Sequence, residues 1–202
     1  MDGVFLAVVV MVVVHLLNQH EARGRIALLG AHLRKHPIEP LMAELCNGYL
    51  RAMDTQDPDR RRQIWAVLAN AEHELTRQLN QLAADFSQVF GAHTQVSRLP
   101  VALPRIRQLF PRACFDLRDL INLHAQGIAT LVANPGGLSP RDRAFTLTAE
   151  MLLLQHSCHW FCRSQAVASA RLVALHQTSY EQVLASVSPE TRAAYERVVW
   201  GR

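Results

Sequence analysis

An apolar run near the N-terminus, Val4–Leu17, constrains this chain more than any other feature. Its sequence is VFLAVVVMVVVHLL; these fourteen residues contain no charge, and His15 is the only polar one. A helix that crosses the hydrocarbon core of a bilayer needs about 20 apolar residues, with a lower limit near 17. The run is short for such a span, although Gly3 and the two neutral residues after Leu17 bring it to that limit.

Three interpretations of this run compete: an uncleaved membrane anchor, a cleaved signal peptide and a buried core helix. A signal peptide has a basic start and a small-residue cleavage site, whereas Asp2 is acidic and the best candidate site, Ala22-Arg23-Gly24, has arginine at its centre. A core helix is rarely apolar on every face, and the six valines within Val8–Val14 leave no polar stripe. We therefore favour an uncleaved anchor over residues 1–20 that contacts the membrane through residues 4–17.

The charges around the run predict its orientation. Arg23, Arg25, Arg34 and Lys35 follow the run, and no basic residue precedes it. Basic residues stay on the cytoplasmic side of a membrane, so we expect a single-pass protein with most of the chain in the cytoplasm. Unpaired thiols in a reducing compartment agree with this, because the cysteines do not have the spacing of a small disulfide framework. They are Cys46, Cys114, Cys158 and Cys162.

The rest of the chain has the composition of a folded helical domain. Half of the residues are hydrophobic and 19% are charged, so a domain of this length can bury a core without disulfides. We expect residues 21–36 to continue the first helix, which Pro37 ends because the residue before a proline avoids the α region. Residues 37–202 then form a helical bundle domain. The net charge of +4 comes from 20 arginines and a single lysine that are spread along the chain, and it indicates no specific ligand.

One long helix is expected after Asp57, which is a good N-cap followed by Pro58. Apolar residues recur behind it in steps of three and four, which is the pattern of a helix packed along its whole length. We expect it to end before Gly91. The seam could pack within this chain or form a coiled coil with another subunit, and we favour packing within the chain. Its members are Ile64, Leu68, Ala71, Leu75, Leu79, Leu82, Phe86 and Val89.

Further helices are expected from similar boundary signals, and no alternating β pattern occurs. A second helix should begin near Pro40 and run to about Met53. The connector 92–111 should hold at most one helical turn, around Ile106. The remaining helices are expected at about 113–133, from Ser139-Pro140 to about Gln177, and from Ser188-Pro189 to near Trp200. The predicted fold class is all-α, an antiparallel helical bundle with an N-terminal hydrophobic anchor helix.

Motifs for the familiar kinds of catalysis are absent from the sequence. There is no glycine-rich phosphate loop, no G-x-S-x-G and no C-x-x-C, and the segment beginning His73-Glu74 lacks the second histidine of a zinc-protease motif because Arg77 stands there. We name no catalytic residue and consider an enzymatic role the less favoured reading. The run Arg60–Arg62 has no interleaved aromatics, so we expect no nucleic-acid partner.

The densest group of chemically active residues is His156, Cys158, His159 and Cys162. Residues three or four apart share a helix face, and imidazole and thiolate ligands suit zinc, copper or haem iron. A metal site would need further ligands from another helix, such as His124, His73 or Cys114. The plainer interpretation, which we favour, is a packed helix interface without a cofactor. His32 and His36 form a second, weaker pair at i and i+4.

We therefore predict a membrane-anchored helical scaffold or accessory subunit without its own catalysis. It would have a protein partner or self-associate through its helices. The alternative is a metal- or haem-binding helical protein that uses the group on the helix around residue 159.

Overall fold

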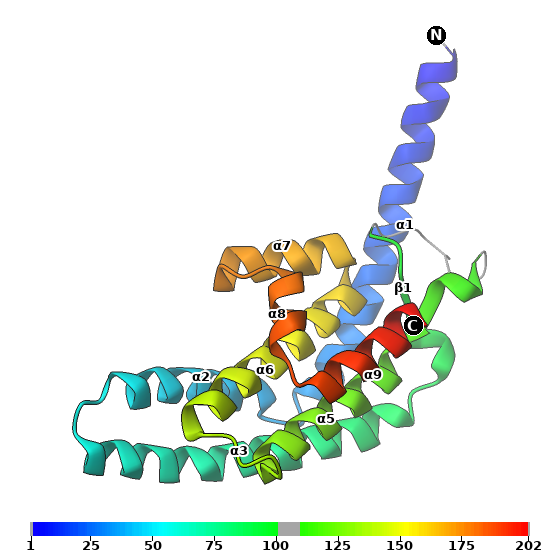
Figure 1. The fold of residues 1–202 in the computed structure, drawn as a ribbon. Helices are drawn as coiled ribbons and strands as arrows, with labels where there is room; N and C mark the ends of the chain where they lie inside the picture. The colour runs from blue at the N-terminus through cyan, green and yellow to red at the C-terminus, as the bar shows by residue number, and fades with distance from the viewer. Residues whose placement is uncertain (1, 101–109, 202) are drawn as a thin grey trace.

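The computed structural model describes residues 2–100 and 110–201, most of which are helical, in agreement with the expected all-α class (Figure 1). The described residues also form two strands and two short 3-10 turns, η1 (Gly91–His93) and η2 (Pro111–Ala113). The strands are β1 (Gln95–Ser97) and β2 (Cys114–Asp116). The α-helices are α1 (Asp2–Leu33), α2 (Ile38–Asp54), α3 (Pro58–Ser87), α5 (Leu117–Ala133), α6 (Pro140–Cys162), α7 (Gln165–His176), α8 (Tyr180–Ser186) and α9 (Pro189–Trp200).

The helices pack into one body from which half of α1 stands clear. α2 lies beside α3, and α3 also packs against α5 (Figure 1). α5 packs in turn against α6 and α9, while α6 contacts α7 and α8. The second half of α1 touches α6 and α3, whereas its first half projects away from the body toward the N-terminus (Figure 1).

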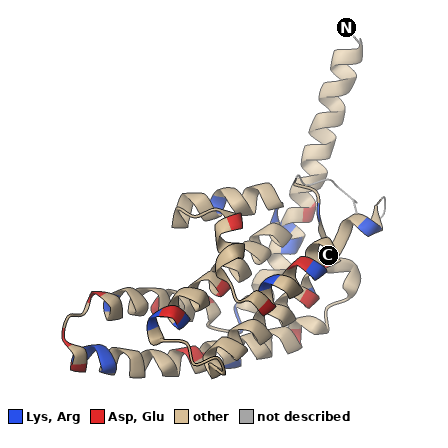
Figure 2. Cartoon of the chain, viewed as in Figure 1, with Lys and Arg blue, Asp and Glu red and all other residues tan. Residues whose placement is uncertain are grey.

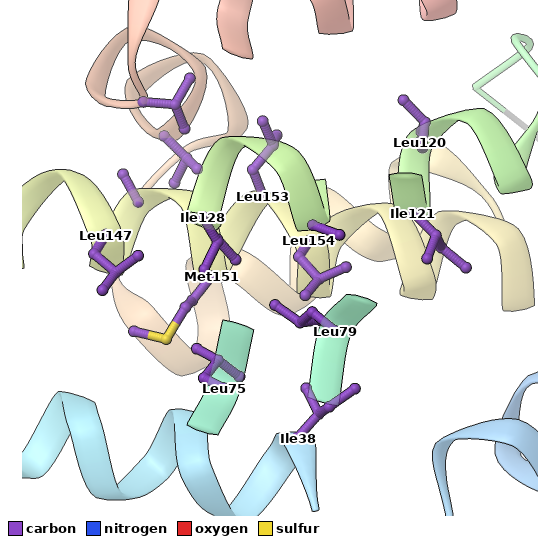
Figure 3. Packing of buried hydrophobic residues seen from close by; sticks show 14 of the residues in the cluster. Ile38, Leu75, Leu79, Leu120, Ile121, Ile128, Leu147, Met151, Leu153 and Leu154 are labelled. Carbon is purple, nitrogen blue, oxygen red and sulfur yellow. The ribbon is translucent and has the colours of Figure 1, made fainter. Parts of the chain in front are cut away.

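The apolar seam of α3 faces the core of the same chain, as favoured from the sequence. Its central members are buried, and Ile64 and Val89 pack at the two ends of the core. Figure 3 shows Leu75 and Leu79 of α3 close to Met151 of α6. Burial of the large apolar side chains along α3 is the main driving force that fixes it between its neighbours. The fully buried members are Leu68, Leu75, Leu79, Leu82 and Phe86.

Three helices begin where an N-cap residue followed by proline predicts a helix start. The side chains of Asp57, Ser139 and Ser188 each accept a backbone N–H from the first turn of α3, α6 and α9, respectively, and a proline follows each of them. Such caps satisfy amides that have no partner inside the helix. α2 begins at Ile38, two residues before the expected Pro40.

The described chain also contains two short strands that the sequence interpretation did not predict. β1 and β2 pair antiparallel, with Val96 opposite Phe115, and both of these side chains are buried. The fourth helix therefore begins at Leu117 and not near residue 113. Three-residue strands are too short to show alternation, and their pairing joins segments that are distant in sequence. The turn expected around Ile106 lies outside the described residues.

Two helix ends also differ from expectation. α3 ends at Ser87 in a right-handed cap at Gln88, and Gly91 starts the 3-10 turn η1 instead of closing the helix. A Cβ atom at Gly91 would lie 2.7 Å from a guanidinium nitrogen of Arg118, so a larger residue there would displace the end of that side chain. The fifth helix, expected to reach Gln177, breaks at Arg163, and Ser164 caps the separate helix α7.

The sequence interpretation missed α8 entirely. Ser179 and Gln182 form a capping box at its start, in which each side chain bonds to the other residue's backbone N–H. Gln177 adopts a left-handed conformation (φ 52°) that ends α7. α8 lies in the stretch between the fifth and the last expected helix, where no helix was predicted.

Candidate functional site

The first half of α1 is the most unusual surface of the molecule. The eleven large apolar side chains exposed between Val4 and Leu17 contact no other part of the described chain closely enough to be buried, and Val4 is 74% exposed. Within the described residues, α1 is a helix long and apolar enough to cross a membrane, and none of the residues in its most apolar stretch is buried. The chain's own fold therefore does not use this segment as a core helix, which was one of the three alternatives.

The second half of α1 is built into the body. Leu29 is 2% exposed, and the guanidinium of Arg25 donates to the carbonyl oxygen of Phe161 (3.4 Å) while lying 5.8 Å from the centre of the Phe161 ring. His32 meets Phe86 of α3 edge to face, with ring centres 5.2 Å apart. One continuous helix thus joins the exposed apolar segment to the packed body.

His36, just beyond α1, is held by α3. Its Nδ1 lies 3.1 Å from Oε1 of Gln78, and its Nε2 lies 3.3 Å from Oδ2 of Asp85. The side chain of His36 is 8% exposed. His32 and His36, the second pair at i and i+4, each make a separate contact with α3.

The two histidines of the α6 group face α7 and α8. His156 is buried; its Nε2 lies 3.1 Å from Oγ of Ser169, and its ring stacks on Tyr180 with centres 4.6 Å apart. His159 is partly buried, with Arg171 and His176 nearby. Burial lowers the pKa of His156 to about 4, so this imidazole is neutral at neutral pH.

The two cysteines of the group lie on the side of α6 that faces α1 and α2. Both pack partly buried against the core. Burial, with the other thiol nearby, raises the pKa of Cys158 to about 12, and burial raises that of Cys162 to about 11. Burial therefore favours the neutral thiol over the thiolate, which is the form that attacks or ligates.

The described residues contain no group of three or more His, Cys, Asp or Glu side chains placed to hold a metal ion. The residues named as additional ligands lie in different surroundings: His73 is exposed on α3, Cys114 is buried in β2, and His124 is buried in α5. A zinc, copper or haem site on His156, Cys158, His159 and Cys162 remains a prediction.

A buried polar layer joins α5, α6, α8 and α9. His124 is 0% exposed, and its Nε2 lies 3.0 Å from Oγ of Ser157, which itself donates to the carbonyl oxygen of Leu153 (2.9 Å). Burial and the neighbouring His156 lower the pKa of His124 to about 3. The Nδ1 atoms of both histidines have no hydrogen-bond partner among the described residues, so protonating either one would place an unpaired charge in the core.

Glu150 of α6 lies in the same layer and holds the start of α9. Its Oε1 accepts from the backbone N–H (3.2 Å) and the hydroxyl (3.1 Å) of Ser188. Burial raises the pKa of Glu150. Gly127 of α5 leaves room for this contact, because a Cβ atom there would lie 2.4 Å from Oγ1 of Thr191 and 3.3 Å from Oε2 of Glu150.

A buried ion pair connects α2, α3 and α6. Arg143 lies 3.0 Å from Oε2 of Glu72, and the hydroxyl of Tyr49 donates to Oε1 of the same carboxylate (2.9 Å). The side chain of Glu72 is 2% exposed. Burial and the adjacent Glu72 raise the pKa of Tyr49. Sequence reasoning missed this group, although a charged residue beside the apolar seam of the long helix was a usable signal.

These buried groups favour a structural role. His124, Ser157 and Glu150 are each at most 2% exposed, so a substrate could not reach them without opening the helix packing. The Nε2 atom of His124 is paired with the Ser157 hydroxyl, and Oε1 of Glu150 holds the first turn of α9, so the bonds that these groups do make are structural ones. No catalytic role is assigned to them.

No known protein-family model matches this chain, and neither the curated proteins nor the solved structures contain a significant match to it.

Proposed function

We propose that this chain is a membrane-anchored helical scaffold or accessory subunit. The observation that supports this is the division of α1 into an exposed apolar half and a half packed into the body. Full burial of a Val, Leu or Phe side chain stabilises by about 1.5 kcal/mol or more. Eleven such exposed side chains therefore favour insertion into lipid strongly over exposure to water.

In this proposal the anchor is uncleaved and holds the body at a fixed angle. Cleavage near Ala22 would cut α1 just before the contacts of Arg25 and Leu29 with the body. The apolar run is shorter than a usual span, and a bilayer accommodates a short span by thinning locally. The body, as an antiparallel helical bundle, would lie in the cytoplasm, because the basic residues follow the run.

The anchor is tested by placing charges in the run. Arginine near the bilayer centre costs about 3 kcal/mol per residue on the translocon scale, so Val9→Arg with Val12→Arg should move the full-length protein from the membrane fraction to the supernatant. Ala27→Arg, at an exposed position of the same helix beyond the run, is the matched control and should stay in the membrane. A doubly substituted protein that still resists carbonate extraction would refute the anchor.

The cytoplasmic orientation has its own test. Protease added to intact cells should leave the C-terminal body whole and degrade it only after the cells are opened. Degradation in intact cells would reverse the proposed orientation.

The scaffold role requires a partner or self-association. Because the seam of α3 packs inside the chain, a contact with another subunit would use other surfaces, such as the exposed Leu50 of α2 and Val67 of α3. Full-length protein purified in mild detergent should be a homo-oligomer or bring a partner in fixed stoichiometry. A protein that migrates as a monomer without partners would contradict the scaffold role.

The alternative function, metal or haem binding, is tested on the same sample. We expect no stoichiometric zinc or copper and no haem absorbance. One metal ion per chain that is lost on His156→Ala but not on the exposed-site change His20→Ala would replace the scaffold proposal with the binding one.

A further inference from the structure

The outer face of α7 is apolar and unpartnered. Ala168 and Leu172 are its buried residues and face the body. The opposite side of the helix has no charged residue except Arg171 at its edge. The exposed residues on and beside this side are Ala166, Val167, Ala170, Val173, Ala174 and Leu175.

α7 begins beside the point where α1 leaves the body. Arg25 of α1 contacts Phe161 at the end of α6, and Ser164 then starts α7. Arg25 follows Leu17, the last residue of the apolar run, by eight residues, which is about 12 Å along an α-helix. Figure 1 shows α7 at the end of the body from which α1 projects, running across the direction of α1.

This position places the outer face of α7 near the edge of a bilayer spanned by α1. α7 packs on α6, and Ser169 contacts His156 of that helix, so its outer face points away from the body. A helix with its side chains is about 5 Å in radius, which leaves this face roughly 7 Å from the level of Leu17. The headgroup layer on each side of the hydrocarbon core is about 5–8 Å thick, so the face would lie within it.

Several arginines lie near the start of α7 and near the point where α1 leaves the body. Arg25 and Arg163 both lie close to Cys162, and Arg171 lies close to His159. Arg23, Arg163 and Arg171 are exposed, whereas Arg25 lies 3.9 Å from Glu21. Figure 2 shows basic residues on α7 and where α6 meets α1. Arginine guanidinium groups beside a bilayer attract anionic headgroups.

We propose that α7 is an interfacial helix that lies in the headgroup layer of an anionic bilayer, with Val167 and Val173 in contact with lipid. This rests on the proposed function, since the bilayer is the one that α1 would span. An interfacial helix buries its apolar face at the boundary between headgroups and acyl chains. Two contacts, α1 and α7, would then fix both the distance and the tilt of the body at the membrane.

A photo-crosslinking experiment on the full-length protein tests this directly. p-Benzoylphenylalanine replaces Val173, and the protein is irradiated in vesicles of phosphatidylcholine and phosphatidylglycerol and in native membranes. Val10 of α1 is the anchor position, and Val67, which is 62% exposed near the start of α3, is the matched control. Mass spectrometry counts lipid adducts at each position.

We expect lipid adducts at Val10 and at Val173, with a yield at Val173 at least five-fold above that at Val67. A Val173 yield equal to that of Val67, beside a strong Val10 adduct, overturns the interfacial helix and leaves the anchor standing. A missing Val10 adduct overturns the anchor, while the Val173 yield still decides whether α7 contacts lipid. An adduct of Val173 in native membranes to a protein, without lipid, overturns the lipid assignment.

Discussion

Acid should destabilise this protein through two buried histidines. His124 and His156 have pKa values of about 3 and about 4 in the folded chain because they are buried, against 6.5 for an unburied histidine. Between pH 6.5 and these lower values, the unfolded chain binds a proton at each site and the folded chain does not. The stability that the neutral histidines contribute is therefore complete above pH 6.5 and is lost as the pH falls toward 4.

The size of the effect follows from the same shifts. At pH 5 each histidine removes about 2 kcal/mol of unfolding free energy relative to pH 7, and the two together remove about 4 kcal/mol. For a protein of this size, 1 kcal/mol changes the melting temperature by about 2–4 °C. We therefore expect a fall of about 8–16 °C between pH 7 and pH 5 from these two groups.

Other groups also titrate, so the test compares variants. Glu150 acts in the opposite direction, because burial raises its pKa and protonation then favours the folded chain. Replacing both histidines with glutamine keeps a polar group near Ser157 and Ser169 but removes the titration, and Glu150 titrates in both proteins. The exposed-site change His73→Gln is the control.

The assay is thermal unfolding of the full-length protein in detergent, followed by intrinsic tryptophan fluorescence at pH 7 and pH 5. Trp160 is a suitable reporter because it is 1% exposed and its ring centre lies 5.9 Å from that of His156. The double glutamine variant should show a much smaller fall than the wild type, and His73→Gln the full fall. An equal fall in the wild type and the double variant would refute the role of the buried histidines.

Two further predictions concern the core. Arg143→Met leaves Glu72 buried without its cationic partner and should lower the free energy of unfolding in urea by about 3–5 kcal/mol. Arg192→Met breaks an exposed pair on α9 and should lower it by less than 1 kcal/mol. Equal losses would mean that the buried pair does not stabilise the fold. Gly127→Ala brings a Cβ atom within 2.4 Å of a threonine hydroxyl of α9 and should cost about 1–3 kcal/mol, while Gly136→Ala, which meets nothing within 4 Å, should be near neutral in the same measurement. A Gly127→Ala protein as stable as the wild type would show that the close approach of α5 to Thr191 does not limit the stability of the fold.

The sequence predicted the elements whose cause is local. A cap needs only a polar side chain beside the first turn, so Asp57, Ser139 and Ser188 mark three helix starts. The seam of α3 follows from spacing alone, because residues three and four apart share a face. Where a local signal was overlooked, the prediction failed: without the cap of Ser164 the fifth helix was predicted too long, and without the capping box of Ser179 α8 was missed.

The surroundings of the histidines and cysteines on α6 depend on tertiary contacts that residue spacing does not predict. Spacing put His156, Cys158, His159 and Cys162 into one group, because residues three or four apart share a helix face. In the structure the two thiols lie near α1 and α2, whereas the two imidazoles lie near α7 and α8. Spacing cannot say that His156 stacks on Tyr180 or that the thiols face α1 and α2, because these contacts join segments distant in sequence. The pKa values of these groups depend on burial, which the tertiary packing sets.

The sequence by itself determined that this chain is mostly helical and that its first helix begins with an apolar segment, since composition and short-range spacing fix both. That this segment is exposed was decided by the tertiary structure. Only the tertiary structure decided that the second half of α1 is packed into the body, that β1 pairs with β2, and that Glu72 and Arg143 meet in the core. The physical reason is that the free energy of these arrangements comes from desolvation and contact between distant residues, and such terms exist only once the helices have packed together.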